Sequence, residues 1–182
     1  MSLSKTSTPV DALHENIRSS GGLVAYSDAT WRRPNSLGFN MFGFVVYFMG
    51  APISFTSKQL KVVALSSAEA EYAAASYACR EVMFVRSVLV DLGFPIQHPT
   101  VVCVDNKAAI EIAHNLGVTS RNKHFVDAIH YFRHVVDHRL VIPTHVITKH
   151  QRADGFTKCL GKTPFKEWLR LLLPPACFMD AV

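Results

Sequence analysis

The chain has 182 residues, of which 49% are hydrophobic, and it carries a formal net charge of +5. This composition excludes an intrinsically disordered chain and provides enough apolar residues for one domain with a sizeable core. No apolar stretch reaches the roughly 20 uncharged residues of a membrane span, and the mild positive charge suits an acidic partner such as nucleic acid without requiring one.

The two ends of the chain differ from its middle. Residues 1–20 begin with the polar segment MSLSKTSTPVDA, which lacks the apolar core of a signal peptide. We interpret these residues as a flexible leader or an artificial boundary of the sequence. One domain is expected over residues 21–175, followed by a tail at 176–182.

The four cysteines are Cys79, Cys103, Cys159 and Cys177. None of them forms a CxxC pair, and two lie in strongly apolar segments. A zinc knuckle or a disulfide framework is therefore not expected. Reduced cysteines that act as small apolar residues imply an intracellular protein.

The first part of the domain predicts three strands joined by tight turns. Apolar and β-branched runs occupy Leu23–Ala29, Phe39–Phe48 and Ile53–Ser57. The segment Gly50-Ala51-Pro52 is a turn signal between the second and third runs. These features predict an antiparallel meander.

After the third strand the hydrophobic period becomes helical. Ser66-Ser67-Ala68-Glu69 fits a capping box. Behind it, apolar residues recur every three or four positions from Tyr72 to Leu92. Gly93 and Pro95 are expected to end this long helix.

The second part of the domain predicts two more strands between helices. Thr100–Val104 is apolar throughout, which is typical of a central parallel strand. Leu140–Ile147 contains Pro143, which indicates an edge position or a bulge. Helices are expected at Lys107–His114, around the stripe of Phe125, Ile129, Phe132 and Val136, near Asp154, and at Pro164–Leu173. The order predicts an α/β domain, with a mixed five-stranded sheet and helices on both of its faces.

Four acidic residues stand at the end of an apolar run or beside one: Asp28, Glu71, Asp105 and Asp154. Burial of a lone charge is costly unless a metal or a partner neutralises it. The strand ends would bring Asp28 and Asp105 side by side, and the starts of two helices would add Glu71 and Asp154. Four carboxylates in one place form a hard, oxygen-ligand site for divalent cations, which suits two-metal phosphodiester chemistry.

Five short blocks stand in the order of five motifs of one known family. The most specific block is Val63–Tyr72, VALSSAEAEY, which resembles the motif VALSSTEAEY. The other blocks are YSDATW, VDNKAAI, SRNKH and ADGFTK, which resemble YSDADW, CDNQSAI, SRTKH and ADILTK. The family is the ribonuclease H domain of Ty1/copia-type retrotransposon polyproteins, and the resemblance covers residues 23–173.

The resemblance implies an RNase H-like fold and cleavage of the RNA strand of RNA–DNA hybrids with two Mg²⁺ ions, for which Mn²⁺ can substitute. The four metal-binding carboxylates of the family fall on Asp28, Glu71, Asp105 and Asp154. Glu71 is preferred to Glu69 because AEYAA resembles the AEL-A pattern of retroviral relatives. The implied setting is reverse transcription in the cytoplasm, a retroelement particle or the nucleus, with the reverse transcriptase part of the same polyprotein as a partner.

Recognition of a hybrid is expected to depend on backbone and shape, because the enzyme must cut any sequence. Ser66, Ser67 and Asn106 flank the acids and are candidate contacts to ribose or phosphate. Arg121, Lys123 and His124 form a basic cluster that suits the phosphates of the DNA strand. A purely structural role is the alternative for each, and Ser66 already has one as a helix cap. Trp31 and Phe42 are expected in the core rather than as stacking platforms.

The histidines allow further interpretations. His150 is a candidate for proton transfer or product release, and the alternative is an exposed loop histidine. His130, His134 and His138 stand four apart, a spacing that zinc can use. No cysteine or acid completes that set, so a solvated helix face is the preferred interpretation.

Two other functions compete with the endoribonuclease. The first is a domesticated or partner-dependent domain that binds nucleic acid or supports a reverse transcriptase without cutting. The second is another nuclease or an integrase of the same fold. Activity on duplex DNA without ribose would favour this last interpretation.

Overall fold

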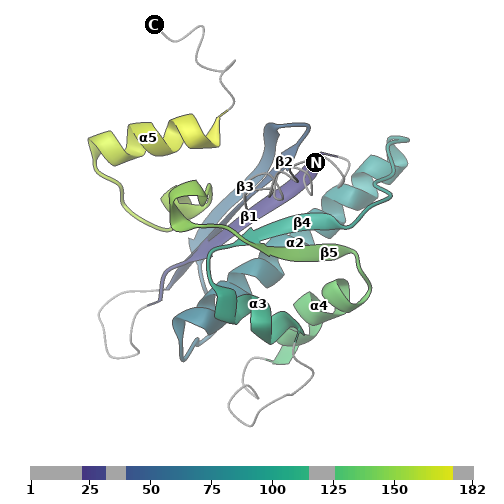
Figure 1. The fold of residues 1–182 in the computed structure, drawn as a ribbon, viewed down its shortest axis with the longest axis horizontal. Helices are drawn as coiled ribbons and strands as arrows, with labels where there is room; N and C mark the ends of the chain where they lie inside the picture. Colours follow the sequence, from purple (N-terminus) through teal and green to yellow (C-terminus); the bar gives the residue numbers. More distant parts are fainter. Residues whose placement is uncertain (1–21, 32–39, 115–125, 174–182) are drawn as a thin grey trace, which may run out of the picture.

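The computed structural model describes residues 22–31, 40–114 and 126–173. They form an open five-stranded sheet in the order β3-β2-β1-β4-β5, with helices packed on it (Figure 1). The predicted mixed sheet is confirmed. The expected leader, the expected tail and Cys177 lie outside the described residues, so the domain limits stay predictions.

The first three strands form the predicted meander. β1 (Leu23–Ala29) pairs antiparallel with β2 (Met41–Phe48), which pairs antiparallel with β3 (Ala51–Gln59). The predicted turn and the predicted start of β3 are wrong. The turn falls at Met49 and Gly50, whose φ angles of 51° and 86° suit a two-residue hairpin loop. The next two residues are therefore free to pair with β2, and proline is tolerated there because β3 is an edge strand.

The parallel half of the sheet agrees with the sequence pattern. β4 (Thr100–Val104) is buried throughout and runs parallel to both β1 and β5 (Val141–His145). Pro143 lies on the edge strand β5, opposite Val102. β5 is shorter than expected because the chain turns at Ile147 into a 3₁₀ helix, η2 (Thr148–His150).

Helices cover both faces of the sheet, as predicted. α2 (Ser67–Asp91), α3 (Lys107–His114) and α4 (Val126–Asp137) share one hydrophobic core with alternate residues of the strands. On the other face, α5 (Lys162–Leu172) closes a smaller core that contains Tyr26 and Tyr47. Figure 1 shows α2 crossing behind the sheet and α5 set toward its upper left side. This two-sided packing leaves the carboxyl ends of β1 and β4 as the place where both layers meet.

The cap of α2 sets the rotation of that helix. The Ser66 hydroxyl accepts a hydrogen bond from the Glu69 amide at 3.2 Å, as the capping box predicts. The Glu69 carboxylate accepts from the Leu65 amide at 2.7 Å, one residue before the cap. Small residues, including Ala70 and Ala74, face the sheet and allow the helix to approach it closely.

The late helix expected near Asp154 is only a single 3₁₀ turn, η3 (Asp154–Phe156). The buried Gln151, which precedes this turn, bonds the segment to the sheet. Its amide nitrogen donates to the Ser27 carbonyl at 2.9 Å, and its amide oxygen accepts from Ala153 at 3.2 Å. The segment is thereby fastened beside β1.

Two further expectations concern the surroundings of the chain. Cys79 and Cys103 are free and buried, and Cys159 is free and exposed. Burial raises the pKa of the Cys103 thiol to about 12, so this thiol is unreactive at neutral pH. Among the described helices, none is both long enough and apolar enough to cross a membrane.

Candidate active site

The parallel register of β1 and β4 brings two of the predicted acids together. Ser27 pairs with Val104, so Asp28 and Asp105 follow at the same edge of the sheet. Parallel strands point their carboxyl ends toward one edge, where α/β sheets carry their sites. Asp28 is 1% exposed, and Asp105 is half-buried.

The third acid comes from the first turns of α2. Glu71 is 6% exposed, and its Oε1 accepts a hydrogen bond from the Ala29 amide at 3.2 Å. Carboxylate oxygens of Asp28, Glu71 and Asp105 all lie within 4.8 Å of one another. We call these three residues the carboxylate trio. In the described part of the chain, no other group of three histidines, cysteines or acids has this spacing.

Within the described residues, no basic side chain forms a salt bridge with the trio. Glu71 Oε2 is buried and has no hydrogen-bond partner within the described residues. Burial raises the pKa of Glu71 to about 9, and the charges of Asp28 and Asp105 add to the effect. Burial also raises the pKa of Asp28 to about 6, although a hydrogen bond from Thr157 opposes the rise. The pKa of Asp105 is raised by burial as well.

These observations fit a divalent cation. Three convergent carboxylates are the oxygen donors that Mg²⁺ and Mn²⁺ prefer. A buried, unpartnered carboxylate oxygen such as Glu71 Oε2 costs free energy unless it is protonated or bound to a cation. A bound dication would lower the three pKa values by direct attraction.

Asp154 lies beside the trio and not within it. Its carboxylate forms an ion pair with Lys158, four residues further along η3 and the following turn. It is still close enough for its charge to raise the pKa values of Asp28 and Asp105. The structure thus brings three of the four predicted acids into ligand distance of one another and leaves the fourth bound to a lysine.

Two residues that the sequence reasoning did not select also reach the trio. The Thr157 hydroxyl donates to Asp28 Oδ2, and the Lys158 ammonium lies near enough to affect all three carboxylates. Both belong to the ADGFTK block. Their positions three and four residues after Asp154 place them on one side of a helical turn, which is the signal that could have identified them.

Two glycines allow η3 to lie against the sheet. Gly43 stands opposite Asp28 in β2, and a Cβ there would come within 2.5 Å of the Phe156 Cβ. A Cβ on Gly155 would come within 2.4 Å of the Trp168 ring on α5. The absence of these side chains lets η3 pack between the sheet and α5, so that Asp154 and Thr157 are held beside β1.

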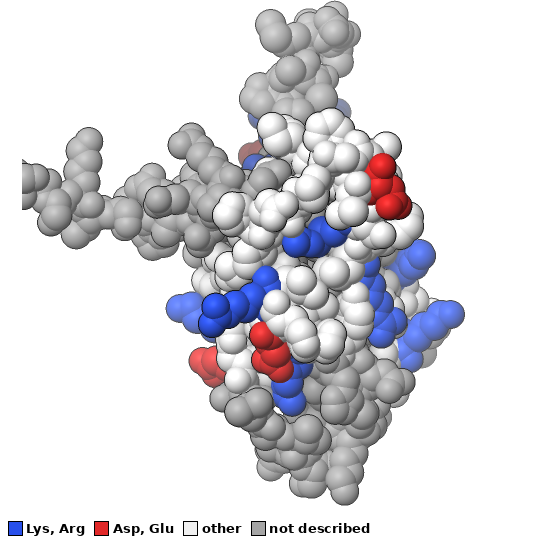
Figure 2. All heavy atoms as spheres, turned by 90° about the vertical axis from the view of Figure 1, so that its right-hand side faces the viewer, with Lys and Arg blue, Asp and Glu red and all other residues white. Residues whose placement is uncertain are grey.

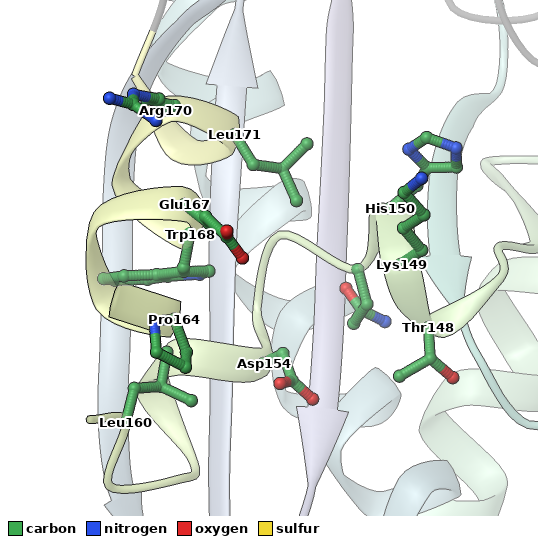
Figure 3. Close-up of a pocket in the computed structure, with 11 residues that line it drawn as sticks. Thr148, Lys149, His150, Asp154, Leu160, Pro164, Glu167, Trp168, Arg170 and Leu171 are labelled. Atoms are coloured by element: carbon green, nitrogen blue, oxygen red, sulfur yellow. The ribbon is translucent and has the colours of Figure 1, made fainter. Parts of the chain in front are cut away.

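His150 stays apart from the trio. It is exposed and lines a hollow of about 690 Å³ between η2 and α5. Asp154, Trp168 and Glu167 line the same hollow, as Figure 3 shows. A role of His150 in proton transfer or product release remains a prediction.

The expected substrate contacts are only partly described. Ser66 and Asn106 are both helix caps. The Ser66 hydroxyl accepts a hydrogen bond from the Glu69 amide, and Asn106 Oδ1 accepts one from the Ala109 amide at 3.2 Å. Ser67 is exposed at the first position of α2. The basic cluster of Arg121, Lys123 and His124 lies outside the described residues. On the face in Figure 2, Lys and Arg side chains are dispersed among neutral residues and do not form one continuous patch.

Trp31 and Phe42 match their structural interpretations, and the histidine row is described only in part. Trp31 packs on the α2-side core and donates to the Ala64 carbonyl at 3.2 Å, and Phe42 is buried and stacks on Tyr77. His134 and His138 are exposed, with ring centroids 4.0 Å apart. The His130 side chain lies outside the described part.

Comparison with known proteins identifies homologues among retrotransposon proteins. The chain is 35% identical over 159 residues to the retrovirus-related Pol polyprotein from transposon RE2 of Arabidopsis thaliana, covering 85% of this chain and 11% of that protein. It is 31% identical over 144 residues to the corresponding polyprotein from transposon TNT 1-94 of Nicotiana tabacum, covering 79% of the chain and 11% of the relative. The chain thus spans about a tenth of the length of these curated relatives. No family model matches the chain.

Solved structures with the same fold are ribonuclease H domains. One is LC11 RNase H1 in complex with an RNA/DNA hybrid, with a TM-score of 0.55 and 16% identity, covering 74% of this chain and 92% of that one. Another is the N-terminal RNase H domain of Rv2228c from Mycobacterium tuberculosis, with a TM-score of 0.53 and 15% identity, covering 74% of this chain and 89% of that one. These similarities establish the fold.

Proposed function

Because the chain is homologous to Ty1/copia-type retrovirus-related Pol polyproteins and has the ribonuclease H fold, we propose that it is a metal-dependent endoribonuclease. It would hydrolyse the RNA strand of RNA–DNA hybrids during reverse transcription. The observation that carries this proposal is the carboxylate trio, whose members come from three distant segments and whose oxygens lie within 4.8 Å of one another.

The donor set supports a site for divalent cations. Asp28 and Asp105 would serve two Mg²⁺ ions, Glu71 would complete one of them and Asp154 the other, and Mn²⁺ would substitute. When bound, such ions activate a water molecule and stabilise the leaving 3′-oxygen of a phosphodiester.

The chain's own residues prepare the site for that chemistry. The Ala29 amide orients Glu71, and the Thr157 hydroxyl orients Asp28. Such fixed orientation lowers the cost of assembling ligands around a charged centre. Asp154 would take part only after it separates from Lys158.

The substrate and partner proposals follow from the relatives. A structural neighbour was solved with an RNA/DNA hybrid, which supports the same class of substrate for this chain. The matched relatives are Pol polyproteins, which supports the reverse transcriptase part of such a polyprotein as a partner. The corresponding location would be the cytoplasm, a retroelement particle or the nucleus.

A cleavage assay tests the proposed function. An RNA–DNA hybrid labelled on its RNA strand is incubated with the chain in Mg²⁺, in Mn²⁺ and in EDTA. RNA fragments are expected with either cation and not with EDTA. Asp105→Asn should reduce the rate by at least about 100-fold, a typical loss when a charge that stabilises the transition state is removed. Asp91→Asn, which removes the exposed acid at the end of α2, should cut at the wild-type rate.

The same assay separates the competing functions. If the chain binds the hybrid but does not cleave it with either cation, the result would favour a domesticated or partner-dependent binding domain over an enzyme. Cleavage of an all-DNA duplex at a comparable rate would indicate another nuclease of this fold. Equal rates for Asp105→Asn and wild type would refute the role of the trio.

A further inference from the structure

A lysine side chain lies against the carboxylate site. The Lys158 ammonium is paired with Asp154 Oδ1. The preceding residue, Thr157, is hydrogen-bonded to Asp28, so the backbone at Lys158 is held close to the trio. The Lys158 side chain is 43% exposed and that of Asp154 is 22% exposed. The ion pair therefore stands at the mouth of the site, where one side of it meets solvent.

The charge of Lys158 acts on the trio as well as on Asp154, and we call these four acids together the acid cluster. Its positive charge opposes the pKa rises of Asp28, Glu71 and Asp105, which burial causes first of all. Burial alone would lower the pKa of Lys158, but the hydrogen bond to Asp154 and the surrounding negative charges outweigh it and raise that pKa. A lysine ammonium is charged at neutral pH, so the ion pair with Asp154 makes Lys158 a counter-ion carried by the chain itself.

The trio and Asp154 differ in how readily they can bind an incoming cation. In the described structure, no ammonium is bonded to a trio carboxylate, and Glu71 Oε2 has no partner. Asp154 is already engaged, and an ammonium and a dication beside the same carboxylate repel each other. A lysine side chain is long and flexible, and the exposure of Lys158 leaves it a route outward.

We propose that Lys158 is a tethered counter-ion that competes with a divalent cation for Asp154. This inference rests on the proposed cation site and adds an order of events. The trio takes the first cation, and a second cation uses Asp154 only when Lys158 has moved away. Lys158 is thus a positioning residue that sets the cation concentration at which Asp154 binds the second cation.

Cation binding without nucleic acid tests the proposal. Free Mn²⁺ is counted by electron paramagnetic resonance during titration of the intact chain at low ionic strength. The wild type should show a tighter and a weaker class of bound ion. Lys158→Gln should tighten the weaker class on the order of fivefold, the range of a partly exposed ion pair. Lys158→Arg should keep it weak, because it keeps the charge.

Two controls separate a local effect from a general one. Lys162→Gln removes the same charge from an exposed position at the start of α5, and it should leave the weaker class unchanged. In an Asp154→Asn background, Lys158→Gln should no longer have an effect, because the carboxylate for which the two cations compete is gone. Thermal unfolding in EDTA establishes that each variant is folded.

Several results would overturn the proposal. One is an unchanged affinity of the weaker Mn²⁺ class in Lys158→Gln, and another is an equal increase of that affinity in Lys162→Gln. The others are an increase that persists in the Asp154→Asn background, and the absence of any bound Mn²⁺. The cleavage assay reports separately on the proposed function. A chain that binds Mn²⁺ as described but cuts nothing refutes the endoribonuclease and keeps the role of Lys158. If the chain cleaves the hybrid but its Mn²⁺ affinity is the same in wild type and Lys158→Gln, only this inference is refuted.

Discussion

At the scale of single residues, the site depends on Glu71. This carboxylate is buried, one of its oxygens has no partner among the described residues, and its nearest charged neighbours within the trio are negative. Without a cation, the favourable state is the protonated one. The same residue that would hold a metal therefore destabilises the metal-free fold at high pH.

The pH dependence of the metal-free chain follows from this. The folded pKa of Glu71 is raised from 4.5 to about 9, and that of Asp28 from 3.8 to about 6. At pH values between the unfolded and the folded pKa of each group, the folded chain binds more protons than the unfolded chain. The stabilisation from these groups is therefore greatest below their unfolded pKa values and is lost as the pH rises through their folded pKa values. Thermal unfolding in EDTA should show a midpoint several degrees lower near pH 8 than near pH 5.

Glu71→Gln should remove much of this slope and raise the midpoint near pH 8, because the amide never ionises. Glu167→Gln, an exposed acid on α5, should leave the slope as it is in wild type. A midpoint that rises with pH over the same interval in wild type would contradict the assignment.

Thr157 offers a second prediction at this scale. Thr157→Val keeps the shape of the side chain and removes the hydroxyl that donates to Asp28. Hydrogen bonds to charged groups contribute about 1.5–3 kcal/mol, so cation affinity and cleavage in limiting Mg²⁺ should fall by about tenfold or more. Thr163→Val, at an exposed position of α5, serves as the control. Wild-type Mg²⁺ dependence in Thr157→Val would show that the hydroxyl does not position Asp28.

The candidate site was predictable only in part. Asp28 and Asp105 could be found because each stands at the end of an apolar run that forms a strand, and Glu71 was preferred to Glu69 because AEYAA resembles the AEL-A pattern of retroviral relatives. Gln151 could not, because its contact depends on how a short 3₁₀ segment packs across β1, and Thr157 and Lys158 offered only their spacing from Asp154 as a signal. No local pattern of hydrophobic residues encodes that packing.

At the scale of elements, η3 is held between the sheet and α5 by close contacts at glycines. Gly43→Ala would place a Cβ 2.5 Å from the Phe156 Cβ and 3.2 Å from the Thr56 carbonyl oxygen. Overpacking of this kind costs about 1–3 kcal/mol. The midpoint of thermal unfolding should fall, and cation binding should weaken because η3 carries Asp154 and positions Thr157.

Gly161→Ala is the matched control, because nothing lies within 4 Å of its Cβ position and its φ of −67° suits any residue. Equal midpoints and equal cation affinities for the two alanine variants would contradict the proposed packing role of Gly43.

The elements themselves were largely predictable. β4 is a continuous apolar run, and the period of α2 is helical over many turns, so both could be identified without tertiary information. The β2–β3 turn was misplaced because Met49, a residue that rarely adopts positive φ, does so here. The late helix was overestimated, because the backbone forms only the single 3₁₀ turn Asp154–Phe156 before the next helix begins at Lys162.

At the scale of the whole molecule, the acids connect both layers of the fold. Asp28 and Asp105 come from the sheet, Glu71 from the α2 layer and Asp154 from the α5 side. A cation held by them would join segments whose acids are 34 to 126 residues apart in the chain. Ligand binding to the folded state alone stabilises it by mass action.

Cation removal should therefore change global stability. Millimolar Mg²⁺ should raise the midpoint of thermal unfolding near pH 8 by a few degrees relative to EDTA. Asp105→Asn should lose most of this increase, and Asp91→Asn should retain it. An equal increase in both variants would mean that Mg²⁺ acts elsewhere on the chain.

A crystal of the chain soaked in Mn²⁺, with anomalous scattering recorded to locate the metal, tests the carboxylate site most directly. We expect a peak in contact with carboxylate oxygens of Asp28, Glu71 and Asp105. Well-ordered side chains at these positions with no peak between them, or a peak bound only at other residues, would contradict it.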